Sequence, residues 1–458
     1  MKNITLKTIQ DVTGGKVYNG RGNMDTEVSA IIHDSRKVSD NCVFLCIKGE
    51  RTDGHNYAKQ VLDNGALAVI CERKLPLAGP YVLVDSVLEA AQKIAAFYRK
   101  TTGIKVVGIT GSVGKTSTKE FVAAVLAKRY RVHKTKGNLN NQWGVPFTLF
   151  GIDDRTEVAV VEMGISDHGE MNELARMARP DIAVITNIGE SHLEHFGTRE
   201  GILQAKSEIF NYMDQNGKIV LNGDDDKLST IVSARGIRPS FFGMGNGCHV
   251  SAQKVVDKGL AGTEFDMIMR DGGGKMSVHI ELPVPGIQNI YNALAAADVG
   301  LMMGISPMQI KAALAGLKNA DGRGNIITTK SFMILDDCYN ASPKSMESSI
   351  DLLQKMPGRK VAILGDMLEL GELSDKLHFR VGKYAAKAGT DVIVCVGTRS
   401  EKTYMAARMS TDNQVELFHD NEECIDALPA ILEPGDSILV KASNSMHFYE
   451  IVDALKEM

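Results

Sequence analysis

A short stretch of the chain, from Thr110 to Thr116, has the residue types of a phosphate-binding loop. An apolar run at 106–109 precedes it, and a predicted amphipathic helix over 116–128 follows. Such a strand, glycine turn and helix direct backbone N–H groups and a lysine toward an anion. We therefore expect Lys115 to hold phosphates and the hydroxyl of Thr116 to bind Mg²⁺; a tight turn that carries Gly-Lys-Thr by chance is the alternative. The loop consists of Thr110, Gly111, Ser112, Val113, Gly114, Lys115 and Thr116.

Two further apolar runs, 157–164 and 181–187, end in polar residues. In a doubly wound sheet the carboxyl ends of the strands form the ligand crevice. Glu162, Thr186 and Asn187 should then lie close to the phosphate loop. A glutamate at this place suits Mg²⁺, which prefers one or two carboxylates together with phosphate oxygens. A strand-end acid that faces solvent is the alternative.

Three other features have competing interpretations. His192 and His195 are spaced like a zinc pair, but no third ligand is near them in the sequence, so we do not expect zinc. Lys206 lies on a predicted amphipathic helix, where a lysine is usually a solvated charge. Asn289 and Asn292 share one helical face and could bind a purine or cap the helix.

The composition restricts the class of protein. The chain has 458 residues, of which 44% are hydrophobic and 24% charged, with a net charge of −4. We expect two to four domains and no dedicated nucleic-acid binding. The seven cysteines form no Cys-x-x-Cys pair, which indicates idle thiols in a reducing compartment. There is no apolar signal core at the start and no run long enough for a membrane span, so we expect a cytoplasmic protein.

The pattern of strands and helices predicts an α/β protein of three domains. A small α/β domain covers 1–102, a central ATPase-like parallel sheet covers 103–318, and a Rossmann-like parallel sheet covers 319–458. Alternating residues over 249–282 indicate antiparallel hairpins at the edge of the central domain. The third domain lacks a glycine-rich dinucleotide fingerprint. Its expected strands are 332–336, 360–364, 392–396 and 437–440.

Taken together, the motifs resemble those of the Mur ligases over nearly the whole chain. The matching runs in the central domain are 110–116, 138–142, 162–164, 186–189, 191–194, 205–208 and 288–293. The runs Asp336–Pro343 and Gly365–Gly371 are most similar to the family members that add D-alanyl-D-alanine. One run departs from the pattern: 441–444 reads Lys-Ala-Ser-Asn, where such enzymes commonly show a Lys-Gly-Ser-Arg-like sequence.

The resemblance implies an ATP-dependent ligase of peptidoglycan precursor synthesis. ATP would phosphorylate the terminal carboxylate of a UDP-MurNAc-tripeptide, and the amine of D-Ala-D-Ala would attack the acyl phosphate. ATP, two Mg²⁺ ions and a monomeric protein are the corresponding expectations. Another amide ligase of the Mur superfamily, such as folylpolyglutamate synthetase, is one alternative, and a nucleotide-binding module without catalysis is another.

The resemblance also assigns roles to individual residues. Catalytic roles fall on Lys115, Glu162, His192 and Lys206, and metal binding falls on Thr116, Glu162, His192 and Lys206. Sister ligases carry a carbamylated lysine at the position of Lys206. Asn289 and Arg323 would contact adenine and ribose or phosphate. The UDP-sugar pocket would contain Ser35, Arg36, Gly49, Glu50, Arg51, Asp53 and His55, in loops that spacing alone favours as solvated. Asp337, Tyr339 and Asn340 would lie on the third domain, which closes over the nucleotide.

Overall fold

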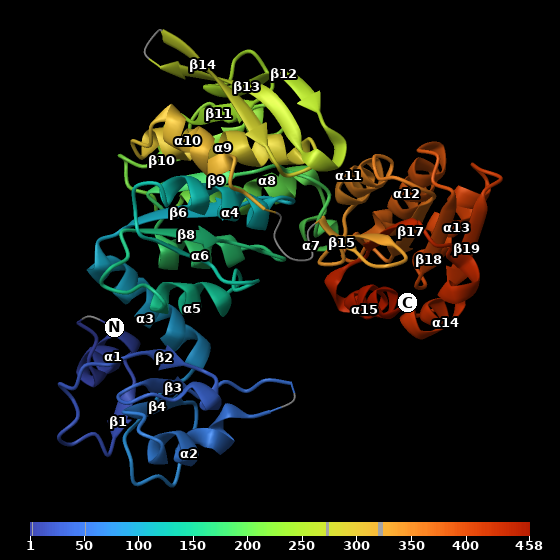
Figure 1. The fold of residues 1–458 in the computed structure, drawn as a ribbon. Helices are drawn as coiled ribbons and strands as arrows, with labels where there is room; N and C mark the ends of the chain where they lie inside the picture. The colour runs from blue at the N-terminus through green and yellow to red at the C-terminus, as the bar shows by residue number, and fades with distance from the viewer. Residues whose placement is uncertain (2, 51, 272–273, 319–323) are drawn as a thin grey trace.

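The computed structural model describes residues 1, 3–50, 52–271, 274–318 and 324–458. Three sheets follow one another along the chain, each with its own helices. Figure 1 shows them as an N-terminal unit in blue, a central unit in green and yellow, and a C-terminal unit in orange and red beside it. The expected three-part α/β fold is confirmed. Among the described residues, no helix has the length and apolar character needed to cross a bilayer.

The N-terminal unit is a five-stranded sheet in the order β1-β5-β4-β3-β2, in which β1 alone is antiparallel to its neighbour. The strands are β1 (Lys16–Tyr18), β2 (Ile31–Ile32), β3 (Val43–Leu45), β4 (Ala68–Cys71) and β5 (Tyr81–Leu83). The helices are α1 (Leu6–Thr13), α2 (Ala58–Asp63) and α3 (Val87–Thr102).

Helix α3 fastens the N-terminal unit to the central unit. Its last turns carry two buried polar side chains that bond across to the central unit. The hydroxyl of Tyr98 donates to the carbonyl of Ile152 at 2.6 Å. The guanidinium of Arg99 donates to the carbonyl of Ala178 at 2.9 Å and pairs with Asp181 at 2.9 Å. Because these buried groups find hydrogen-bond partners across the boundary, they fasten the two units to each other.

The central unit is a nine-stranded sheet in the order β14-β13-β12-β11-β10-β9-β6-β8-β7. Strand β6 lies between β8 and β9 in the sheet, so the connection from β8 to β9 crosses β6. The carboxyl end of β6 is therefore a topological switch point. The hairpins expected over 249–282 are confirmed as β12, β13 and β14, which pair antiparallel at the edge. The strands are β6 (Lys105–Thr110), β7 (Val132–Lys134), β8 (Val158–Glu162), β9 (Ile182–Ile185), β10 (Lys218–Asn222), β11 (Ser240–Gly243), β12 (Val250–Asp257), β13 (Thr263–Asp271) and β14 (Gly274–Leu282).

Helices cover both faces of the central sheet (Figure 1). On one face α4, α9 and α10 pack on each other and on an apolar core that includes Val107 and Ile109. The helices are α4 (Lys115–Leu126), α5 (Gly144–Phe150), α6 (Glu170–Ala178), α7 (Leu193–Phe196), α8 (Arg199–Ser207), α9 (Gln288–Met302) and α10 (Pro307–Leu314).

The C-terminal unit is a six-stranded sheet in the order β15-β16-β20-β17-β18-β19. The expected parallel sheet is confirmed for β16 to β20, but β15 pairs antiparallel with β16. The link between these two strands is too short for the crossover that a parallel pair needs. The strands are β15 (Asn325–Thr328), β16 (Met333–Asp336), β17 (Lys360–Gly365), β18 (Val392–Val396), β19 (Gln414–Phe418) and β20 (Ser437–Lys441). The helices are α11 (Pro343–Leu353), α12 (Ser374–Lys387), α13 (Glu401–Arg408), α14 (Asn421–Ile431) and α15 (Tyr449–Glu457).

Candidate functional site

The phosphate loop joins β6 to α4 at the switch point of the central sheet. Two of its glycines have positive φ, +146° at Gly111 and +86° at Gly114, and Gly114 caps the N-terminus of α4. A Cβ atom on Gly111 would stand 2.0 Å from Oγ1 of Thr186. Only glycine therefore allows this close packing, which leaves the start of α4 open to an anion.

The residues after β9 hold the phosphate loop in shape. The backbone N–H of Val113 donates to the side-chain oxygen of Asn187 at 3.0 Å, and Thr186 donates to the carbonyl of Val113 at 2.6 Å. The N–H of Gly189 donates to the hydroxyl of Ser112 at 2.8 Å. The expectation that the ends of β8 and β9 lie beside the loop is confirmed.

Glu162, at the end of β8, lies directly behind Thr116. One carboxylate oxygen, Oε1, accepts from the hydroxyl of Thr116 at 3.0 Å and from the amide of Asn140 at 2.8 Å. The other oxygen, Oε2, is buried and accepts no hydrogen bond from the described part of the chain. This arrangement excludes the alternative of a solvent-facing acid, since the Glu162 side chain is 1% exposed. It joins a hydroxyl and a carboxylate beside the phosphate loop.

Lys119 belongs to the same cluster, although the sequence analysis did not single it out. Its side chain is 1% exposed, and Nζ lies 3.4 Å from Oε2 of Glu162 and 3.3 Å from Oε1 of Glu120. It stands one helical turn after Lys115 on α4, and that spacing is a signal that could have indicated it. Lys119 supplies the positive charge that balances the buried carboxylate.

Lys206, on α8, is buried rather than solvated, so the expectation from its helical position is wrong. Its residue is 1% exposed, and Nζ has no hydrogen-bond partner among the residues that the structure describes. Burial lowers the pKa of Lys206 far below its usual value, and the charge of Lys115 lowers it further. Burial and the nearby cation therefore both disfavour the charged form of this amine. Nζ of Lys115 itself donates to the carbonyl of Gly111 at 2.9 Å.

His192 stands at the start of α7, where the central unit meets the C-terminal unit (Figure 1). Its Nδ1 lies 2.5 Å from Oε2 of Glu369, in ion-pair contact without the alignment of a full hydrogen bond. The contact with His192 keeps the pKa of the Glu369 carboxyl below its usual value. Nearby, Arg380 of α12 pairs with Glu190 at 2.8 Å. Glu369 lies in a run singled out in the sequence, but the sequence analysis gave it no role.

The two asparagines of α9 are buried in a chain of hydrogen bonds. The amide of Asn289 donates to the carbonyl of Pro285 at 2.8 Å, and Asn292 donates to the side-chain oxygen of Asn289 at 2.9 Å. Asn292 also accepts from the hydroxyl of Thr118 on α4 at 2.8 Å. These bonds join the start of α9 to the helix of the phosphate loop. Arg323 lies outside the described residues.

The two loops expected to bind the UDP-sugar lie in the N-terminal unit. In each loop an aspartate accepts hydrogen bonds from nearby residues of the same loop. Asp34 caps a 3-10 helix that contains Ser35 and Arg36, and the guanidinium of Arg36 donates back to Asp34 at 2.9 Å. Asp53 accepts from the ring of His55 at 2.6 Å, and the other ring nitrogen of His55 accepts from a backbone N–H at 3.1 Å.

His55 is thus engaged at both ring nitrogens and braces its loop. In the same loop, the N–H of Gly49 donates to the carbonyl of Thr52 at 2.9 Å. Glu50 is exposed, and Arg51 lies outside the described residues.

On the C-terminal unit, Asp337, Tyr339 and Asn340 form one loop that the departing run 441–444 holds in place. Nζ of Lys441 donates to Asp337 at 2.5 Å and to the carbonyl of Asn340 at 3.0 Å. Asn444, which stands where an arginine is common in related enzymes, donates to the carbonyl of Tyr339 at 3.1 Å. Asn444 thus makes a polar contact to this loop.

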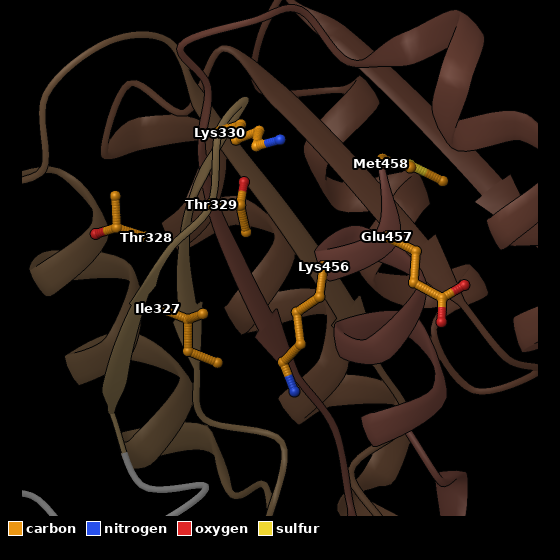
Figure 2. A pocket seen from close by; sticks show the side chains of 7 residues that line it. All are labelled: Ile327, Thr328, Thr329, Lys330, Lys456, Glu457 and Met458. Carbon is orange, nitrogen blue, oxygen red and sulfur yellow. The ribbon is translucent and has the colours of Figure 1, made fainter.

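A cavity of about 720 Å³ connects the central and C-terminal units beside the phosphate loop. It is lined by Thr116, Lys119, Lys134 and Lys318 of the central unit and by Tyr339 of the C-terminal unit, among others. A second hollow of about 780 Å³ lies between residues 327–330 and residues 456–458 (Figure 2). None of the predicted site residues lines that hollow.

The residues beside the loop suit Mg²⁺ by their chemistry. Thr116 offers a hydroxyl, and Glu162 offers a buried carboxylate oxygen without a hydrogen bond. In the part of the chain that the structure describes, no three His, Cys, Asp or Glu side chains gather into a group able to hold a metal by themselves. Mg²⁺ takes much of its coordination from phosphates and water.

Family models, curated relatives and solved structures all point to the same protein family. The models for the Mur ligase catalytic, middle and glutamate ligase domains match residues 27–127, 109–300 and 322–444. The UDP-N-acetylmuramoyl-tripeptide–D-alanyl-D-alanine ligase of Bacillus subtilis is 37% identical, over 99% of this chain and 98% of its own. The crystal structure of MurF from Acinetobacter baumannii is 31% identical and superposes with a TM-score of 0.89 over 99% of both chains. MurF ligase from Thermotoga maritima, solved in complex with ADP, is 31% identical with a TM-score of 0.80, over 93% of this chain and 97% of that one.

Proposed function

The chain belongs to the Mur ligase family, and we propose that it joins D-alanyl-D-alanine to UDP-MurNAc-tripeptide at the expense of ATP. The observation that carries the proposal is the phosphate loop with Glu162 packed behind Thr116, in a chain that matches such ligases over its full length. ATP phosphorylates the terminal carboxylate of the tripeptide, and the amine of the dipeptide displaces phosphate from the acyl phosphate.

The protein's own contribution is mainly placement and charge, as in other phosphoryl transfers. Both reactants of the first step are anions, so they repel each other. Lys115 and the N–H groups at the start of α4 hold the phosphates of ATP. Lys119 pairs with Glu162, which stays oriented behind Thr116.

Mg²⁺ enters the proposal as the ion held by Thr116 and Glu162, with a second ion at His192 and Lys206. When bound, Mg²⁺ screens the charges that meet in the transfer. An uncharged lysine amine reacts with CO₂ to give a carbamate, and the lowered pKa of Lys206 favours that form. A carbamate would turn this lysine into an anionic oxygen ligand. The absence of a partner for its Nζ supports this role.

The remaining residue roles are assigned unit by unit, with the domains covering 1–102, 103–318 and 319–458. The loops with Ser35, Arg36, Gly49, Glu50, Asp53 and His55, and Arg51 with them, bind the UDP-sugar. Asn289 and Arg323 bind the nucleotide. Asp337, Tyr339 and Asn340 close the site from the C-terminal unit, which is supported by Tyr339 lining the cavity beside Thr116. Closure excludes water from the labile acyl phosphate.

We further propose that the protein acts as a monomer in the cytoplasm. One chain provides every residue assigned to the site. Each of its seven cysteines is a free thiol, and free thiols persist in reducing compartments.

Phosphate release tests the proposed reaction. The protein is incubated with UDP-MurNAc-tripeptide, ATP and Mg²⁺, with and without D-Ala-D-Ala, and the product is identified by its mass. We expect phosphate release that depends on the dipeptide, and a product larger by one dipeptide less water. Release that ignores the dipeptide would point to another amide ligase, and no release at all would point to a nucleotide-binding module.

A further inference from the structure

The approach of Glu369 to His192 joins two units of the protein at the proposed metal site. Glu369 lies between β17 and α12 of the C-terminal unit, and His192 precedes α7 of the central unit, 177 residues earlier. Their side chains meet at 2.5 Å, between Nδ1 of the ring and Oε2 of the carboxylate. The His192 side chain is 19% exposed and that of Glu369 is 46% exposed, so the contact is partly shielded from water.

The backbone around this contact is specific. The N–H of Glu194 donates to the carbonyl of Glu369 at 3.2 Å. A Cβ atom on Gly371 would approach Cα of Glu194 to 3.0 Å, so the two loops pack backbone against backbone. His192 and Glu369 have φ values of +61° and +62°, which are costly for residues with a side chain. Strain of this kind persists where the surrounding structure determines it and gathers at functional sites.

The loop that carries Glu369 is itself rigid. The N–H of Met367 donates to the buried ring of His378 at 2.9 Å. The N–H of Leu368 donates to the hydroxyl of Ser443 at 2.9 Å, and the N–H of Ser443 donates to the carbonyl of Asp366 at 3.0 Å. A carboxylate held by such a loop can fix the orientation of the group it contacts.

We propose that Glu369 is a positioning residue that holds Nδ1 of His192, so that Nε2 is the ring atom presented to a metal ion. The inference rests on the proposed function, which makes His192 a metal ligand. Histidines that bind metals usually donate their second ring N–H to a carboxylate, which fixes the tautomer and the ring orientation. Here the carboxylate comes from the C-terminal unit. The metal site at His192 is therefore complete only when that unit is docked on the central one.

The test measures metal binding directly. Mn²⁺ is titrated into the full chain in the presence of a non-hydrolysable ATP analogue, and free Mn²⁺ is followed by electron paramagnetic resonance. We expect two bound ions for the wild type and the loss of one in His192→Ala. Glu369→Ala should weaken that same ion about 10- to 100-fold, the usual range for such supporting carboxylates. Glu369→Gln, which keeps an oxygen atom but loses the negative charge, should lie between Glu369→Ala and the wild type.

Three controls separate positioning from other effects. Glu372→Ala removes an exposed acid three residues further along and should leave Mn²⁺ binding unchanged. The double variant Glu369→Ala/His192→Ala should bind no more weakly than His192→Ala, because Glu369 acts only through the ring. Small-angle X-ray scattering should give the same domain arrangement for Glu369→Ala and the wild type.

The outcomes distinguish this inference from the proposed function. If the wild type binds a single Mn²⁺, or if His192→Ala keeps both ions, the metal role of His192 itself is wrong. If those results hold and Glu369→Ala binds Mn²⁺ like the wild type, only the positioning role is overturned. It is also overturned if Glu372→Ala has an equal effect, if the double variant is additive, or if the scattering curve expands.

Discussion

Replacement of Glu162 by glutamine tests both the stability and the chemistry of the central site. Glu162→Gln keeps the shape of the side chain and removes its charge. In the wild type, the carboxylate accepts hydrogen bonds from Thr116 at 3.0 Å and from Asn140 at 2.8 Å, and it faces Nζ of Lys119 at 3.4 Å. After the change, Lys119 remains buried without its main counter-charge.

The loss of stability follows from burial. Both side chains of the pair are 1% exposed, and removal of one partner of a buried ion pair costs about 3–5 kcal/mol. Lys119 keeps Glu120 at 3.3 Å, whose side chain is 28% exposed, so we expect the lower end, roughly 3 kcal/mol. In a unit the size of the central one this corresponds to a fall of about 6–12 °C in melting temperature.

The loss of activity follows from the proposed role of the carboxylate. A metal ion at such a site contributes several kcal/mol to the stabilisation of charge in the transition state. A loss of about 4 kcal/mol lowers the rate of phosphate release by roughly a thousandfold. Saturating ATP and Mg²⁺ stabilise the wild type by about 2.7 kcal/mol at 100 times their Kd, and the variant should lose most of this gain.

Glu120→Gln is the matched control, because it makes the same change to the other partner of Lys119. Its acid is partly exposed, so the expected cost is below about 1 kcal/mol and activity should be retained. Melting is followed by calorimetry and activity by phosphate release. The reasoning would be refuted if Glu162→Gln had the same melting temperature as Glu120→Gln and kept an activity within about tenfold of the wild type. A tenfold loss corresponds to a barrier change of roughly 1.4 kcal/mol.

Three further predictions concern other parts of the fold. Gly111→Ala should abolish binding of an ATP analogue, measured by calorimetry. The control Gly137→Ala should not, because Gly137 also has a positive φ, +52°, but has open space around it. Equal effects would mean that backbone strain alone, and not the close packing at Gly111, causes the loss. Burial lowers the pKa of His378, so its stabilisation is complete above the unfolded pKa near 6.5 and is lost as the pH falls below it. The melting temperature should therefore decline from pH 7.5 to 5.5, with a smaller slope in His378→Gln and an unchanged slope in the exposed control His419→Gln; identical slopes in all three would contradict this. Asn444→Ala removes one hydrogen bond to a loop carbonyl, worth about 0.5–1.5 kcal/mol, so KM for the dipeptide should rise by no more than roughly tenfold, and a complete loss of activity would show a larger role.

Much of the local structure could be predicted because short patterns determine it. Strand β6 is an apolar run, and the glycines after it occupy positions that only glycine tolerates. Alternation over 249–282 predicted the edge hairpins, which the register of β12 to β14 confirms. Strands of two or three residues, such as β2 and β7, are too short to show alternation, so the sequence analysis missed them.

The chemistry of the site depends on both the local sequence and the tertiary structure. The sequence by itself determined which groups stand at strand ends and helix starts, because those positions follow from local periodicity: Glu162 after β8 is the clearest case. Only the tertiary structure decided that Lys206 is buried and has a lowered pKa, because its environment comes from the packing of distant segments. The same holds for the contact of His192 with Glu369, which joins residues of two units. Burial and charge pairing of this kind arise from long-range packing, which no local pattern in the sequence records.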